Sequence, residues 1–265
     1  VTPCVIINAF QVKATAETQK GLFLAFAAAI AVHLFLLLIT FILKKPLHLD
    51  VVERATVIYT NAGILVIPLV RKLLGQEYVI YSSAFIIVQV VLLWTHCKSM
   101  LCEEKTIEWK KIIFNVNLIS IAIGVCFFLL HIELPEDMQD ILNTMSNLLG
   151  PLGMLLAGMV IAEIPLSAVF SRKREYLPAA LRLLICPALV LILMKLFYHF
   201  SGGTDVRNIL LTVYLASITP ACTMVTSMAQ LYEKDAAYAS SLYVLTTLLS
   251  IITMPVMVYL FQMGV

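Results

Sequence analysis

Charged residues are scarce in this chain. Only 13% of its 265 residues are Asp, Glu, Lys or Arg, whereas 61% are hydrophobic and the mean hydropathy is +0.97. A soluble domain needs more charge to cover its surface, so the composition excludes that class and predicts a polytopic membrane protein. The net charge of +2 gives no sign of a nucleic-acid partner. The lipid bilayer is the partner that the composition predicts.

Clustered metal ligands and catalytic motifs are also missing from the sequence. The six cysteines form no close pair and no Cys/His cluster, so we interpret them as small hydrophobic residues rather than metal ligands or disulfides. Neither an HExxH motif nor paired aspartates occur, although a membrane-embedded hydrolase would use one of them. We therefore expect no metal, no cofactor and no enzymatic activity.

Acidic residues are absent from the middle of every long apolar run. This argues against a buried carboxylate relay of the kind that drives many proton antiporters. His33 is the titratable residue nearest a run's middle, and an imidazole can change charge near neutral pH. His33 is therefore a candidate for proton coupling, with a neutral structural histidine as the alternative. Arg182 and Lys195 lie near the ends of one run, where we expect their side chains to reach the inner and outer membrane interfaces.

Long apolar runs predict eight complete membrane spans after a first, incomplete one. They cover residues 21–43, 55–70, 78–97, 112–131, 141–162, 176–200, 208–232 and 236–265. The chain opens inside an apolar segment too short to cross a bilayer, so we expect about one and a half spans of the first half to be missing.

The distribution of basic residues predicts how the spans are oriented. Loops on one side hold eleven Lys and Arg residues and loops on the other side hold five. By the positive-inside rule, the richer side is cytoplasmic. We therefore expect a plasma-membrane protein with the central loop 98–111 inside and the C-terminus outside. The poorer, outer side carries Lys13, Lys20, Arg71, Lys72 and Arg207.

Two of the spans contain helix-breaking residues near their middle. Residues 55–70 are sixteen uncharged positions, about 24 Å as a continuous helix, which is short of the ~30 Å hydrocarbon core. Gly63 and Pro68 predict that residues 61–68 form a discontinuous helix with free backbone groups, and Pro220 predicts a similar break in span 208–232. Broken helices persist where protein or a wet cavity meets their backbone, which is typical of transporter binding sites.

The positions of these breaks suggest a repeat. Pro68 and Pro220 lie 152 positions apart, and Pro3 and Pro151 lie 148 apart. Because the two broken spans enter from opposite sides, we predict an all-α polytopic membrane protein of two inverted five-helix repeats with crossed broken helices. The first repeat covers residues 1–97, the central loop 98–111 and the second repeat 112–265. The alternative is that mid-span Pro and Gly residues merely kink unrelated helices.

Residues at the breaks also resemble a known family. Asn61-Ala62-Gly63 followed by Ile67-Pro68 is similar to the Asn-x-Gly-Phe-x-Gly-x-Pro crossover motif of the auxin efflux carrier family, which includes bacterial malate and malonate permeases. Residues 2–6, 150–158 and 219–236 resemble its second, seventh and ninth spans, although residues 62–66 lack the aromatic residue and second glycine of the motif. The resemblance implies two inverted five-helix repeats in which the fourth and ninth helices cross, here truncated at the N-terminus.

Helix termini at the breaks suggest what the site binds. Half-helix N-termini carry partial positive charge and free N–H groups, which suit a carboxylate. Asn61 is the favoured contact, with capping of its own helix as the alternative. For the Ser and Thr residues the alternative is a hydrogen bond to their own helix. The predicted substrate-binding residues are Thr60, Asn61, Gly63, Pro68, Thr219, Pro220, Thr223 and Ser227.

Together these features predict a secondary transporter that moves a small organic anion by alternating access. One alternative is a sodium-coupled symporter of the bile-acid type, which would need a cation site of carboxylates and carbonyls. Another is a membrane sensor that binds without transport. The sequence leaves the substrate, the direction, the coupling ion and the oligomeric state open, and a homodimer is compatible with it.

Overall fold

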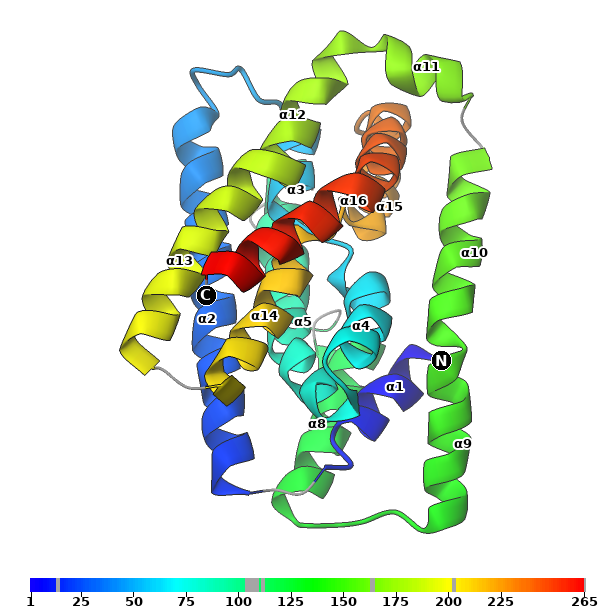
Figure 1. The fold of residues 1–265 in the computed structure, drawn as a ribbon. Helices are drawn as coiled ribbons and strands as arrows, with labels where there is room; N and C mark the ends of the chain where they lie inside the picture. Colours follow the sequence, from blue (N-terminus) through cyan, green and yellow to red (C-terminus); the bar gives the residue numbers. More distant parts are fainter. Residues whose placement is uncertain (13–14, 103–109, 111–112, 163–164, 202–203, 265) are drawn as a thin grey trace.

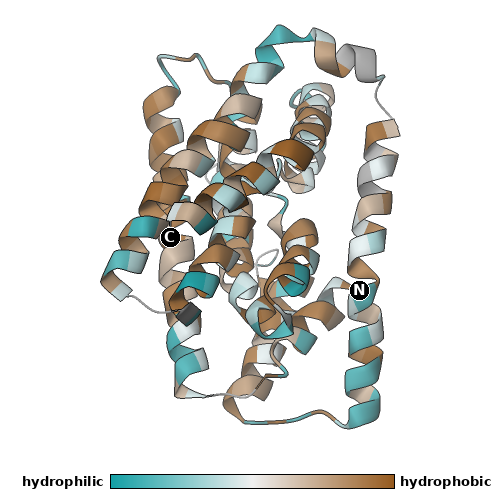
Figure 2. Cartoon of the chain, viewed as in Figure 1, coloured by the Kyte–Doolittle hydropathy of each residue, from teal (hydrophilic) through white to brown (hydrophobic). Residues whose placement is uncertain are grey.

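The computed structural model describes residues 1–12, 15–102, 110, 113–162, 165–201 and 204–264. About 85% of the described residues are helical. Among the described residues, the helices long and apolar enough to cross a membrane are Ala16–Leu43, Gln76–Cys102, Lys173–Ser201 and Ala236–Gly264. Hydrophobic residues run along most of the length of these helices (Figure 2). The predicted all-α polytopic membrane fold is confirmed.

The remaining helices are shorter, and several join end to end. In chain order, the long and short α-helices together are α1 (Thr2–Ala9), α2 (Ala16–Leu43), α3 (Val51–Ile58), α4 (Ala62–Leu73), α5 (Val79–Leu92), α6 (Lys98–Cys102), α8 (Val116–Leu129), α9 (Glu136–Asn147), α10 (Leu149–Ala162), α11 (Leu166–Ser171), α12 (Tyr176–Ala180), α13 (Cys186–Ser201), α14 (Thr204–Ile218), α15 (Thr223–Leu231) and α16 (Ala236–Gly264). Turns of 3-10 helix, Gln76–Tyr78 and Lys173–Glu175, precede α5 and α12. Turns of π-helix, Leu93–Cys97 and Leu181–Ile185, join α5 to α6 and α12 to α13.

These helices form two groups (Figure 1). Helix α1 packs against α8 and α9, and α9 is continued by α10. The other group contains α2 to α6 and α12 to α16, with α14 packed against α2, α4 and α5. We call them the α1/α8–α10 bundle and the crossover bundle. They meet mainly where α10 packs on α4 and where α1 and α8 pack on α5.

The order long helix, broken helix, long helix occurs twice in the crossover bundle. It appears first as α2, α3–α4 and α5–α6, and again as α12–α13, α14–α15 and α16. This order agrees with a repeat of the kind that the sequence predicts. The inverted relation of the two halves and their boundaries remain predictions.

The first break lies earlier in the chain than the sequence predicts. The discontinuity was expected within residues 61–68, but α3 ends at Ile58 and α4 begins at Ala62, so the interruption is Tyr59–Asn61. Gly63 and Pro68 lie inside α4. The expected break is present, but its predicted position is wrong. Pro68 is the seventh residue of α4, where it leaves one helical hydrogen bond unmade without ending the helix, so tertiary contacts rather than Gly63 or Pro68 set the boundary.

Helix α6 shows that the central loop starts later than predicted. The loop was expected to begin at Lys98, but the helix that starts at Gln76 continues through α6 to Cys102, and Lys98 is buried. Residues 103–109 and 111–112 of this loop lie outside the described part of the chain. The predicted span 141–162 is divided between α9 and α10, and Pro151 falls in the first turn of α10, where its missing N–H group leaves no helical bond unmade.

Candidate functional site

The two interrupted helices cross and pair through their backbones. The N–H group of Asn61 donates to the carbonyl of Pro220 at 2.9 Å, and the N–H group of Cys222 donates to the carbonyl of Tyr59 at 3.2 Å. These bonds form an antiparallel bridge between Thr60 and Ala221. Lipid offers no hydrogen-bond partner for exposed backbone groups. At this crossover the N–H and carbonyl groups of one break hydrogen-bond to those of the other.

Side chains from neighbouring helices hold the outer edges of this bridge. The Gln89 amide of α5 donates to the Thr60 carbonyl at 2.8 Å, and its oxygen accepts from the Thr60 N–H at 3.1 Å and hydroxyl at 2.8 Å. The Gln89 side chain thus bonds both the N–H and the carbonyl of Thr60, as the backbone of a neighbouring strand would in a sheet. On the other edge, the Ala221 N–H donates to the Thr246 hydroxyl of α16 at 3.2 Å.

Arg182 binds the ends of both broken helices. Its side chain is 0% exposed and rises from the π-helical turn between α12 and α13, an irregularity often found at functional sites. The guanidinium donates to the Val57 carbonyl at 3.0 Å, to the Thr219 carbonyl at 2.7 and 3.1 Å, and to the Ser217 carbonyl. One buried cation therefore holds the C-terminal ends of α3 and α14 together.

This arrangement leaves the crossover electrostatically positive. Helix C-termini carry partial negative charge, and Arg182 compensates those of α3 and α14. The N-termini of α4 and α15, which start at Ala62 and Thr223, carry partial positive charge. Among the described residues, no carboxylate takes part in the hydrogen bonds of the crossover. The geometry suits an anion better than a cation.

Four of the predicted site residues meet at the crossover. Thr60, Asn61, Thr219 and Pro220 are all within the two breaks, and Thr223 opens α15. The Asn61 side chain does not cap α4, which removes the capping alternative, and within the described residues it makes no hydrogen bond. The Thr219 hydroxyl bonds to the Ala216 carbonyl of its own helix at 3.1 Å, as the alternative for hydroxyl residues anticipates.

The other predicted residues lie away from the bridge. Gly63 faces open space from the first turn of α4, and Pro68 lies further along the same helix. The exposed Ser227 donates to the Thr223 carbonyl at 3.5 Å within α15. Their roles in binding remain predictions.

His33 lies inside the crossover bundle but outside the crossover's hydrogen bonds. Its ring is fully buried, its Nδ1 lies 2.8 Å from the Ala29 carbonyl, and its centroid lies 4.4 Å from that of Phe85. Its Nε2 has no hydrogen-bond partner among the described residues. These contacts fit a structural histidine, and a role in proton coupling remains a prediction.

Sequence reasoning missed two residues that build the site. Arg182 was expected to reach the inner membrane interface, but its side chain turns into the protein and binds backbone carbonyls, so that prediction is wrong. A charged residue within an apolar membrane run often marks a functional site, and this feature of the sequence could have identified Arg182. Gln89 was likewise detectable as a lone amide within span 78–97.

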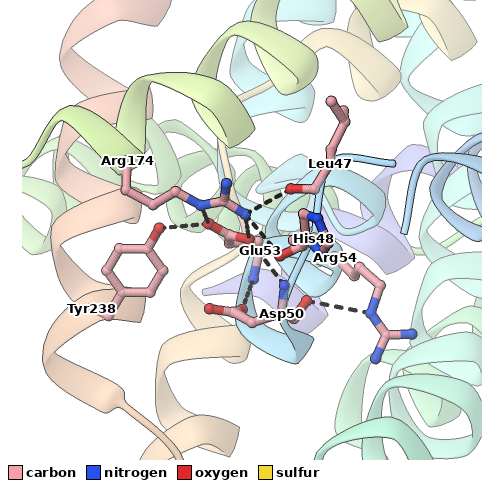
Figure 3. A network of polar contacts seen from close by, with 7 residues as sticks. All are labelled: Leu47, His48, Asp50, Glu53, Arg54, Arg174 and Tyr238. Carbon is pink, nitrogen blue, oxygen red and sulfur yellow. Dashed lines mark hydrogen bonds and ion pairs between the residues drawn. The ribbon is translucent and has the colours of Figure 1, made fainter. Parts of the chain in front are cut away.

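A second polar cluster fixes the start of α3 (Figure 3). Glu53 is 1% exposed and accepts from Arg174 at 2.6 and 2.7 Å and from the Tyr238 hydroxyl at 2.8 Å. Asp50 and Glu53 also form a capping box at this helix end. Arg174 donates further to the carbonyls of Leu47 and His48. The cluster thus ties α3 to the segment before α12 and to α16.

Apolar membrane helices and two crossing broken helices define a multi-pass membrane protein with the architecture that transporters use. The model of the family described as "Membrane transport protein" matches residues 97–258, which is more than half of the chain. The chain belongs to this family, the auxin efflux carriers. The resemblance seen in the sequence is thereby confirmed.

The chain is also similar to a curated protein from Rhizobium meliloti (strain 1021) that is named "Putative malonate transporter". The two are 28% identical over 155 residues, which are 58% of this chain and 46% of the relative. The match therefore spans about half the length of that relative.

Proposed function

We propose that this protein carries a small organic anion, a carboxylate such as malonate, across the plasma membrane. The observation that supports this best is the charge of the crossover. Arg182 compensates the negative ends of α3 and α14, while the positive N-termini of α4 and α15 remain available to an anion. The Asn61 amide, beside the start of α4, is the side chain that we assign to the substrate.

The proposed transport mechanism is alternating access, in which one bundle moves against the other. Helix α10 packs on α4 through small residues: a Cβ atom on Gly153 would lie 2.6 Å from Ile64 Cγ2, and one on Gly150 would lie 3.6 Å from Pro68 Cβ. Small residues let helices approach closely and leave a smooth surface. Such an interface supports movement of the crossover bundle along α10.

Arg182 also bears on the coupling ion. In transporters with broken helices, carbonyls at the half-helix C-termini coordinate a driving sodium ion. Here the carbonyls of Val57, Ser217 and Thr219 accept from a permanently charged guanidinium. A sodium ion at the same carbonyls would be repelled by Arg182, so we favour sodium-independent transport over the bile-acid type of symport.

The proposed function is tested by flux in proteoliposomes of the full-length protein. We expect saturable uptake of labelled malonate at the same rate in sodium and choline buffers. A pH gradient and a membrane potential, imposed separately, would then show whether a proton or net charge moves. Uptake that requires sodium would contradict the role given to Arg182. No flux of malonate, malate or an indole carboxylate by folded protein would favour a sensor instead.

Asn61→Ala tests the assigned substrate contact. We expect the half-saturating malonate concentration to rise about tenfold, because one hydrogen bond to a charged group is worth about 1.5 kcal/mol. The unfolding free energy should change by less than about 1 kcal/mol, since the Asn61 amide makes no hydrogen bond with the described residues.

The matched control is Asn117→Ala, which removes an amide from the first turn of α8, in the other bundle. It should leave both uptake and thermal unfolding at wild-type values. An Asn61→Ala variant with wild-type concentration dependence would remove Asn61 from the site.

A further inference from the structure

A basic cavity lies where the two bundles meet. It has a volume of about 290 Å³ and is lined by the end of α4 and the junction between α9 and α10. Its lining includes two cations and no Asp or Glu among the described residues, so an anion entering it meets no opposing charge. The lining includes Ile67, Arg71 and Lys72 of α4 and Asn147 of α9.

The cavity lies along the same side of α4 as the open space beside the crossover. Gly63, Ile67 and Arg71 are spaced four residues apart, which places them in one row along the helix. A Cβ atom on Gly63 would meet nothing within 4 Å. At about 1.5 Å per residue, Arg71 lies about 12 Å along α4 from Gly63. This row of residues therefore runs along α4 from Arg71 at the cavity to Gly63 near the positive N-terminus of the helix.

The hydrogen bonds of Arg71 leave one edge of its guanidinium unused. Nη1 donates to the Asn147 side chain at 3.0 Å, which links α4 to α9. Nε and Nη2 are buried and have no hydrogen-bond partner among the described residues. These two nitrogens form one side of the guanidinium fork, the side that binds both oxygens of a carboxylate in parallel. Buried donors without partners are costly, so this edge calls for an acceptor.

We propose that this cavity is an anion-capture site, in which the Nε and Nη2 edge of Arg71 binds a carboxylate of the substrate before it reaches the crossover. Lys72 adds a second positive charge at the cavity. The inference rests on the proposed transport of a small carboxylate and extends it to a second binding position. Because Asn147 belongs to the other bundle, the captured anion lies at the interface that alternating access would open and close.

Arg71→Gln tests the capture site, with Arg207→Gln as the matched control. Arg207 is on the same predicted side of the membrane, donates to the Gln262 carbonyl and does not line the cavity. In malonate uptake by proteoliposomes, we expect Arg71→Gln to raise the half-saturating concentration about tenfold, as the loss of one charge-assisted contact implies. Its maximal rate should stay within about twofold of wild type. Arg71→Lys should recover part of the loss, and Arg207→Gln should behave as wild type.

A purely structural role for Arg71 would lower the maximal rate and leave the half-saturating concentration unchanged, and that result would overturn the proposal. A second readout needs no transport. Thermal unfolding of the purified full-length protein is measured in malonate and in chloride of equal ionic strength. We expect malonate to stabilise the wild type and Arg207→Gln, and Arg71→Gln to need about tenfold more malonate for the same shift.

This second readout separates the two proposals. If the wild type carries no carboxylate but malonate stabilises it through Arg71, the capture site stands and the proposed function fails. If uptake is saturable and Arg71→Gln matches wild type in both assays, the proposed function stands and the capture site fails. Stabilisation through Arg71 by phosphatidylglycerol vesicles and not by malonate would assign the cavity to a lipid headgroup and overturn the proposal.

Discussion

Arg182→Gln is expected to abolish malonate uptake and to lower the unfolding free energy by about 3–5 kcal/mol. Glutamine cannot reach the carbonyls of Val57, Ser217 and Thr219 together, so most of them lose their buried donor. The partial negative charge at the ends of α3 and α14 would also stand uncompensated near the substrate. Flux in proteoliposomes and thermal unfolding in detergent measure the two effects.

The control for this prediction is Arg182→Lys, which keeps the charge and loses the planar fork. A lysine ammonium bonds as a point charge, so we expect intermediate stability and weak flux. Millimolar guanidinium ion should partly restore uptake by Arg182→Ala, because it fits the space that the substitution leaves. If Arg182→Gln transported at the wild-type rate, the crossover would not depend on this cation.

Arg174→Ala is expected to lower the unfolding free energy by about 2–3 kcal/mol. The substitution leaves the buried carboxylate of Glu53 with Tyr238 but without its cation, and an uncompensated buried charge is strongly destabilising. Because the Arg174 side chain is 46% exposed, water screens the ion pair and the expected loss falls below that of a fully buried one. Thermal or denaturant unfolding of the purified protein measures it.

Lys173→Ala is the matched control, because Lys173 is the neighbouring cation and is exposed. Its effect should stay within about 0.5 kcal/mol. The double variant Arg174→Ala with Glu53→Gln should recover part of the loss, since the neutral amide no longer carries an unpaired charge. Equal effects of Arg174→Ala and Lys173→Ala would show that the Glu53 cluster contributes little to stability.

Much of the fold was predictable because its causes are local in the sequence. Charge scarcity predicts a membrane protein, and the long runs around His33 and Arg182 predict spans that the structure confirms as α2 and the helix Lys173–Ser201. The break near Pro220 was also located correctly, between α14 and α15. Hydropathy and helix propensity depend on residues within a few helical turns, so a single sequence is enough to predict where the spans lie.

Helix boundaries set by packing were predicted less well. Gly63 and Pro68 were expected to disrupt the helix, yet both are inside α4. The interruption at Tyr59–Asn61 contains no Gly or Pro, and it is stabilised by hydrogen bonds with Gln89 and with Pro220 and Cys222 of the partner break. Those partners are distant in the chain, and a local propensity cannot anticipate them.

Composition and periodicity were enough to predict the membrane class, four spans that the described helices match, and Asn61 as a candidate contact. Only the packed helices showed which groups meet Thr60, that Arg182 turns inward to bind the ends of α3 and α14, and that Arg71 faces Asn147 across the two bundles. The physical reason is that burial and periodicity follow from neighbouring residues, whereas a buried donor binds whichever acceptor the packed helices bring within about 3 Å.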